Sequence, residues 1–192
     1  MDDKQIISDL IARERQYRVT QKTDELEKCY WPDATVTTSW TDKDVPIQAY
    51  LHGGKAPVHD PEFPIISRLG TLIVHQNGKR AYVETPQTTI RWVMVNGEKA
   101  VLTYYIRLMY KVEKRDGEWR ICDNRGIYEG DELAPEIPGT DLKLDLEELK
   151  KYRHSVRYLS YCDGNVSQEL PGIDRPEQVK AMYEALDKWI ME

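Results

Sequence analysis

The strongest indication of the fold class lies between Asn77 and Trp119, where the sequence reads "NGKRAYVETPQTTIRWVMVNGEKAVLTYYIRLMYKVEKRDGEW". It contains three dipeptides that are typical of tight β-hairpin turns, at Asn77-Gly78, Asn96-Gly97 and Asp116-Gly117. The residues between these turns are rich in valine, threonine, isoleucine and tyrosine, which favour strands. We therefore predict an antiparallel meander of long strands, which continues through "EWRICDNRGIYE" at residues 118–129.

The residues before this stretch predict helices and one strand. Apolar side chains recur with helical spacing in "IISDLIARERQY", residues 6–17, which indicates an amphipathic first helix. A second short helix begins near Asp24 and ends before Pro32. Residues 34–40, "ATVTTSW", predict a strand, and residues 46–52, "PIQAYLH", predict a third short helix. Helices followed by a meander predict an α+β fold, with the N-terminal helices packed on one face of a strongly curved antiparallel sheet.

The composition changes after the meander. A proline-bearing connector, "LAPEIPGTDLKLD", occupies residues 133–145, and two helical segments follow it, "DLEELKKY" and the C-terminal "GIDRPEQVKAMYEALDKWIME". We therefore predict a domain over residues 1–135 and a C-terminal helical extension over residues 136–192. Because the apolar side chains of this extension need burial, we expect it to pack on the domain or on a partner subunit.

Composition and charge narrow the class of protein. Of the 192 residues, 40% are hydrophobic and 31% are charged, which is typical of a soluble globular protein. The 27 basic and 33 acidic residues give a net charge of -6, which argues against nucleic acid as a partner. No apolar run approaches the roughly 20 residues that span a bilayer. The acidic N-terminus lacks an apolar signal core, so we expect a cytoplasmic protein without a membrane partner.

Three segments carry a resemblance to a known family. They are "DLIARERQYRVTQKTDELEKCYWPDATVTTSW" at residues 9–40, "SRLGTLIVHQNGKRAYVE" at 67–84, and "RLMYKVEKRDGEWRI" with "IYEGDEL" at 107–133. They resemble the SnoaL-like family of the nuclear-transport-factor-2-like (NTF2-like) superfamily, and the resemblance covers roughly residues 5–135. It implies a cone-shaped sheet wrapped around a pocket that the first helices close. It also implies a homodimer.

The resemblance specifies the fold better than the reaction, because the superfamily includes cyclases, dehydratases and isomerases as well as non-catalytic binding modules. In its dehydratase-like pattern, an aspartate near the end of the first helix acts with a histidine in an "HxxG"-like turn. The corresponding positions here hold Val19 and Ser67. The acid–base pair of that pattern is therefore absent, and its mechanism is not carried over.

Strand alternation predicts which side chains face the pocket. In residues 102–112 the even-numbered positions are the more apolar row, so we expect them to point inward. A two-residue turn at Asn96-Gly97 would pair Arg91 with Leu102 and place Arg91 inside, next to Tyr104. A buried arginine needs an acceptor nearby. This acceptor is either an internal carboxylate, Asp123 or Glu84, or an anionic group of a substrate.

The register of the last strand stays open between two alternatives. A tight turn at Asp116-Gly117 would pair Tyr110 with Asp123 and place Asp123 inside. A three-residue loop with a glycine bulge would instead send Asn124 and Tyr128 inward. An inward Asp123 would be the natural general base.

These observations favour a cofactor-independent small-molecule enzyme, a cyclase, dehydratase or isomerase, acting on an oxygenated hydrophobic substrate such as a polyketide or terpenoid. In this hypothesis Asp123 is the base, Tyr104 the hydrogen-bond donor and Arg91 the group that stabilises an oxyanion. The predicted substrate-binding residues are Tyr17, Trp40, Ser67, Leu108, Asn124 and Tyr128. No histidine or cysteine spacing typical of a metal site is present. The alternative is a non-catalytic NTF2-like ligand-binding or dimerisation module.

Overall fold

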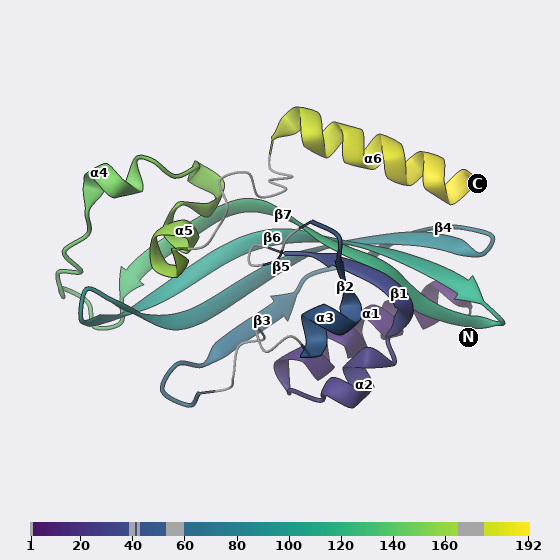
Figure 1. Ribbon diagram of the computed structural model, residues 1–192, viewed down its shortest axis with the longest axis horizontal. Coiled ribbons are helices and arrows are strands. Elements are labelled where there is room, and N and C mark those ends of the chain that lie inside the picture. Colours follow the sequence, from purple (N-terminus) through teal and green to yellow (C-terminus); the bar gives the residue numbers. More distant parts are fainter. Residues whose placement is uncertain (1, 39–40, 42, 53–59, 165–174) are drawn as a thin grey trace.

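The computed structural model describes residues 2–38, 41, 43–52, 60–164 and 175–192. In these residues a curved sheet lies between N-terminal helices on one side and a C-terminal helix on the other (Figure 1). The helices are α1 (Asp3–Val19), α2 (Thr23–Glu27), α3 (Ile47–His52), α4 (Leu146–Leu149), α5 (Arg157–Asp163) and α6 (Pro176–Met191), with a 3-10 turn η1 (His154–Val156). The strands are β1 (Tyr30–Thr37), β2 (Val45–Pro46), β3 (Ile65–Leu69), β4 (Ile73–Asn77), β5 (Arg80–Val95), β6 (Glu98–Arg115) and β7 (Glu118–Pro135).

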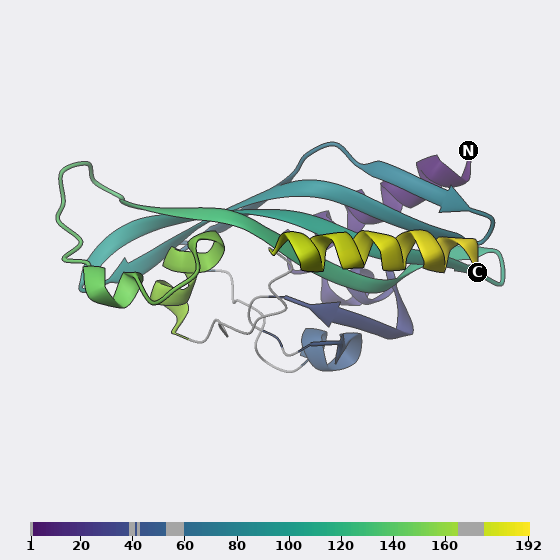
Figure 2. The ribbon, with the colours of Figure 1, turned by 90° about the horizontal axis from the view of Figure 1, so that it is seen from above.

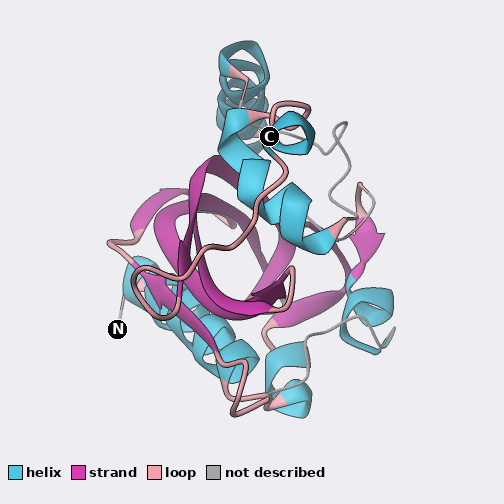
Figure 3. Cartoon of the chain, turned by 90° about the vertical axis from the view of Figure 1, so that its left-hand side faces the viewer, coloured by secondary structure: helices cyan, strands magenta, loops and turns pink. Residues whose placement is uncertain are grey.

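The seven strands form one sheet in the order β2-β1-β7-β6-β5-β3, and β4 also pairs with β5. The long strands β5, β6 and β7 form the predicted antiparallel meander. In contrast, β1 joins β7 in parallel, so the sheet is mixed rather than wholly antiparallel. Viewed along the strands, the sheet curls strongly (Figure 3). The predicted α+β fold with a curved sheet is confirmed.

The glycine-containing turns set the register of the meander. Asn96-Gly97 and Asp116-Gly117 are two-residue turns in which all four residues have positive φ, between +51° and +88°. This is the geometry that matches the twist of two antiparallel strands. The turn at Asn96-Gly97 pairs Arg91 with Leu102, as predicted.

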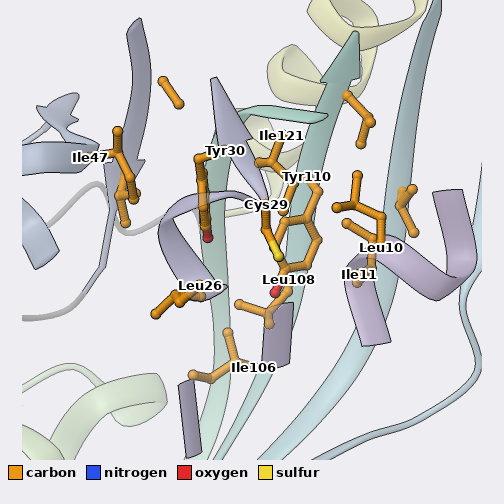
Figure 4. Packing of buried hydrophobic residues seen from close by; sticks show 14 of the residues in the cluster. Leu10, Ile11, Leu26, Cys29, Tyr30, Ile47, Ile106, Leu108, Tyr110 and Ile121 are labelled. Atoms are coloured by element: carbon orange, nitrogen blue, oxygen red, sulfur yellow. The ribbon is translucent and has the colours of Figure 1, made fainter. Parts of the chain in front are cut away.

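The core lies between α1 and the concave face of the sheet. The even-numbered residues of β6 from Leu102 to Val112 are all buried, which confirms the predicted inward row. Figure 4 shows Leu108 and Tyr110 of β6 packed with Leu10 and Ile11 of α1. Asp2 begins α1 by accepting a hydrogen bond from the backbone N–H of Gln5 at 2.8 Å. The core therefore fixes the helix against the sheet.

The C-terminal residues add two contacts to this domain. Helix α6 runs across the outer face of the sheet (Figure 2), where Leu186 packs with Tyr82, Met109 and Ile127. Helix α5, which the sequence analysis did not predict, packs against β5, β6 and β7. Within the described ranges, none of the helices combines the length and apolar character needed to cross a bilayer. The domain boundary at residue 135 stays a prediction.

Candidate functional site

A cavity of about 470 Å³ lies inside the cone. Helices α1, α2 and α3 contribute one side of its wall, and strands β1, β3, β5, β6 and β7 contribute the other. This volume lies within the usual range for pockets that enclose a small organic molecule. The cavity is therefore the candidate ligand site of the chain.

The register of β7 decides which of its side chains reach this cavity. The turn at Asp116-Gly117 is tight, but Cys122 is an extra residue in β7 and makes a β-bulge. Val112 pairs with Ile121, whereas the preceding residue of β6, Lys111, pairs with Asp123. Because side chains alternate along a strand, one extra residue reverses the faces of the residues that follow it, here as far as a second bulge at Glu129.

The bulge brings Asn124, Gly126 and Tyr128 to the cavity wall. The inward Asn124 and Tyr128 agree with the second alternative, but they result from a bulge within β7 and not from the three-residue loop that this alternative assumed. The first alternative, with Asp123 inside, is wrong. Asp123 faces away from the cavity, where it accepts hydrogen bonds of 2.7 Å from the Thr35 hydroxyl and from Nε of Arg125. It is therefore not in a position to act as a base on a ligand in this cavity.

Arg91 lines the cavity as predicted, but its partner is neither of the two predicted carboxylates. Its Nη2 donates a hydrogen bond to the carboxylate of Asp163, at the end of α5. Glu84 instead accepts hydrogen bonds from Tyr183 and His75. The Nε of Arg91 is buried and makes no hydrogen bond.

Tyr104 lies next to Arg91 and is 2% exposed. Burial raises the pKa of its phenol to about 12, and the positive charge of Arg91 opposes this effect only in part. The hydroxyl therefore stays protonated at neutral pH and can donate a hydrogen bond to a ligand.

A short polar wall lies beside these two residues. Gln87 donates a hydrogen bond of 2.7 Å to the Thr89 hydroxyl, and the hydroxyls of Thr89 and Ser67 are 3.3 Å apart. All three side chains line the cavity.

Arg15 and Arg18 line one end of the cavity, which we call the closed end, and behind them lies Glu14, whose side chain is fully buried and is not among the lining residues. Its carboxylate accepts hydrogen bonds from Arg18 at 2.6 and 2.8 Å, from the Tyr30 hydroxyl at 2.9 Å and from the Tyr110 hydroxyl at 3.1 Å. Burial alone would raise the pKa of Glu14, but the charges of Arg18 and Arg15 hold it below its usual value. Glu14 is therefore ionised at neutral pH. Figure 4 shows Tyr30 of β1 and Tyr110 of β6, the two tyrosines that donate to Glu14.

Two arginines of the same helix line this end of the cavity. Nη2 of Arg15 donates to the Tyr110 hydroxyl at 3.0 Å. The guanidinium of Arg18 lies 4.9 Å from the centre of the Tyr50 ring, a cation–π contact.

The charged cluster around Glu14 was not predicted from the sequence. Glu14 and Arg18 follow Ile7 and Ile11 at helical spacing, so the periodicity that predicted α1 also placed them on its buried face.

The other predicted site residues have different outcomes. Ser67 and Leu108 line the cavity. Tyr17 packs against the hydrophobic core and is not among the lining residues, and Trp40 lies outside the described residues. Val19, at the family's aspartate position, also lines the cavity. The resemblance therefore identified two positions in the cavity wall, although neither Val19 nor Ser67 is an acid or base at neutral pH.

No group of three or more metal-ligating side chains occurs among the residues that the structure describes. The prediction that the protein needs no cofactor stays a prediction.

Comparison with known proteins identifies the family. A model of the SnoaL-like domain matches residues 1–125, which include most of the cavity wall. The chain belongs to the SnoaL-like family.

Solved structures similar to this SnoaL-like protein share its fold. A candidate scytalone dehydratase from Novosphingobium aromaticivorans is 13% identical, with a TM-score of 0.54 over 72% of this chain and 95% of the other. A type 2 hexachlorocyclohexane dehydrochlorinase (LinA) is 15% identical, with a TM-score of 0.55 over 71% and 95%. An NTF2-like protein from Cytophaga hutchinsonii is 14% identical, with a TM-score of 0.51 over 66% and 98%. The fold is NTF2-like.

Two fungal relatives are more similar in sequence. Uncharacterized proteins from Emericella nidulans and Aspergillus terreus are each 27% identical to this SnoaL-like protein, over 168 and 177 residues respectively. Each alignment covers 81% of this chain, and the chain spans 70% and 65% of the relatives' lengths. These relatives add no assigned activity.

Proposed function

We propose that this SnoaL-like protein is a cofactor-independent enzyme of lyase or isomerase type. Its substrate would be an oxygenated hydrophobic molecule, such as a polyketide or terpenoid, bound in the cavity. The observation that carries the proposal is the position of Tyr104: a protonated phenol, almost fully buried, in the wall of the cavity beside Arg91.

The chemistry that these groups support is stabilisation of negative charge on a substrate oxygen. When a C–H bond next to a carbonyl breaks, its proton passes to a base, for which the carboxylate of Asp163 beside Arg91 is the candidate, and the electron pair moves onto the carbonyl oxygen to form an enolate. The base then returns the proton to the departing hydroxyl group, to another carbon or to the new alkoxide. A hydrogen bond from Tyr104 and the positive charge of Arg91 would stabilise the enolate, and both act more strongly beside the buried Tyr104 than in open water. The enolate can then expel a hydroxyl group, take up a proton at another carbon or attack a second carbonyl. These outcomes are dehydration, isomerisation and cyclisation.

A second candidate function is binding without chemistry. It is favoured by Val19 and Ser67, which stand in the cavity wall where the dehydratase-like pattern has its aspartate and histidine. It is also favoured by the outward position of Asp123. Under this candidate, the cavity would bind the same class of molecule without converting it.

The experiment that tests the proposal begins with native mass spectrometry of the purified protein and extraction of any bound molecule. That molecule and its oxygenated analogues are then incubated with the wild type and with Tyr104→Phe. Tyr105→Phe is the matched control, because Tyr105 is the next residue but is 40% exposed and bonded to Glu132.

We expect Tyr104→Phe to lower turnover by roughly 100-fold, as the loss of a donor to an oxyanion does, and Tyr105→Phe to leave it unchanged. Binding without turnover in the wild type would support the binding module instead. The same preparation tests the expected homodimer by light scattering.

A further inference from the structure

The closed end of the cavity carries an excess of positive charge. Two guanidinium groups, those of Arg15 and Arg18, face one carboxylate, that of Glu14, at N–O distances of 3.7 and 2.6 Å. The two phenols that share Glu14 are neutral, because burial raises the pKa of both Tyr30 and Tyr110. Among the residues that the structure describes, no second carboxylate pairs with Arg15 or Arg18, so one positive charge of this cluster has no counter-charge there.

This excess is unusual because the groups are withdrawn from water. The side chains of Arg15 and Arg18 are only 12% and 17% exposed. The Nε of Arg15 is buried and makes no hydrogen bond. A buried charge without a partner is costly, so an arrangement of this kind is stabilised by an anion. The other arginine of the cavity differs, since Arg91 already has a carboxylate partner of its own, Asp163.

We propose that the closed end of the cavity binds the carboxylate of an otherwise apolar ligand, held by Arg15 and Arg18. The planar guanidinium is suited to a planar carboxylate, which can accept two hydrogen bonds from it. A single excess charge matches a monoanion rather than a phosphate dianion. The neighbouring lining residues Leu26 and Leu108 provide an apolar environment for the rest of the ligand.

The site also sets the direction in which a ligand would lie. Tyr110, which contacts Arg15, and Tyr104 are both on β6, six residues apart, or about 20 Å along the strand. A ligand anchored by its carboxylate at Arg15 would therefore extend toward Tyr104. This inference rests on the proposal that the cavity is a ligand site, but it does not require that a reaction follows.

The test compares two probes of nearly equal shape, 2-naphthoate and 2-naphthamide, by isothermal titration calorimetry at fixed ionic strength. We expect the wild type to bind the acid at least about tenfold more tightly than the amide, because a hydrogen bond to a charged group contributes this much or more. Arg15→Gln should remove the preference while Glu14 keeps Arg18 as its main partner.

Arg13→Gln is the matched control. It removes the same charge from the same helix, but Arg13 is exposed, and its Nε donates a hydrogen bond to the backbone oxygen of Asp9 at 3.3 Å. This variant should keep the preference for the acid.

Three results would overturn the proposed carboxylate site: equal binding of acid and amide by the wild type, binding of neither compound, or an equal loss in Arg13→Gln. The comparison of 2-naphthoate with 2-naphthamide in the wild type tests the carboxylate site even if Arg15→Gln does not fold. The turnover assay with Tyr104→Phe is separate, so the proposed enzyme would survive the loss of the carboxylate site.

Discussion

Arg18 and Arg91 in the cavity wall each pair with a carboxylate behind it, and the two pairs are built in different ways. Glu14 and Arg18 are one helical turn apart on α1, and Glu14 is enclosed on all sides by the core. Arg91 and Asp163 are far apart in the chain, and their side chains are 17% and 23% exposed. The first pair forms whenever α1 packs on the sheet, whereas the second depends on where α5 docks.

Similar ion pairs beside one cavity can therefore have different structural roles. The pair on α1 belongs to the core of the domain, since Tyr30 and Tyr110 bind the same carboxylate from two strands. The pair at Arg91 belongs to the contact between the sheet and the C-terminal residues. Removing a carboxylate from each should therefore have unequal consequences.

The largest effect is expected for Glu14→Gln. The change leaves two guanidinium groups in the closed end without a carboxylate, so we expect the free energy of unfolding to fall by about 3 kcal/mol or more. Urea unfolding followed by circular dichroism measures this value. Glu25→Gln, at the exposed pair with Lys28, is the control and should change stability by less than about 1 kcal/mol. A similar small loss in Glu14→Gln would show that the closed end is not a buried charge cluster.

The pH dependence of that difference is the next test. The pKa of Glu14 in the folded protein lies below its ordinary value of 4.5. The stability that Glu14 contributes is therefore complete above about pH 4.5 and is lost as the pH falls through the lowered pKa. Unfolding curves of the wild type and Glu14→Gln should converge below pH 4.5. Curves that stay parallel down to pH 3 would mean that Glu14 does not titrate in the expected way.

A smaller effect is expected for Asp163→Asn. The substitution removes one charge-assisted hydrogen bond, but water reaches both partners, so the loss should be about 1 kcal/mol. A double-mutant cycle with Arg91→Gln measures the coupling directly. If Asp163→Asn were as damaging as Glu14→Gln, the contrast between the two pairs would be wrong.

The fold could be predicted from the sequence because of two features, the hairpin turns and the apolar row of residues in β6. Asn96-Gly97 and Asp116-Gly117 need positive φ at both positions, and this requirement specifies the hairpins locally. The inward position of Arg91 followed from the same turn and from strand alternation. The partner of Arg91 could not be predicted, because Asp163 lies at the end of a short helix whose sequence has no helical periodicity.

The bulge at Cys122 was the main structural feature that sequence reasoning could not locate. A cysteine has no conformational preference that indicates a bulge. The flanking residues are compatible both with the register that places Asp123 inside and with the one that places Asn124 inside. Charged residues were a second source of error. Glu14 and Arg18 occupy core positions on α1, although charged side chains are usually exposed to solvent. They can be buried here because they bond to each other and because Tyr30 and Tyr110 supply further hydrogen bonds.

The bulge at Cys122 also has an evolutionary and engineering consequence. Insertion or loss of one residue at this point exchanges two neighbouring rows of side chains as a unit. With the bulge, β7 presents the neutral Asn124 and Tyr128 to the cavity; without it, the same strand would present Asp123 and Arg125. A single codon can therefore replace the uncharged side chains in the part of the wall that β7 forms with a carboxylate and a guanidinium. Related chains could acquire or lose acid–base chemistry by this route without any substitution in the cavity.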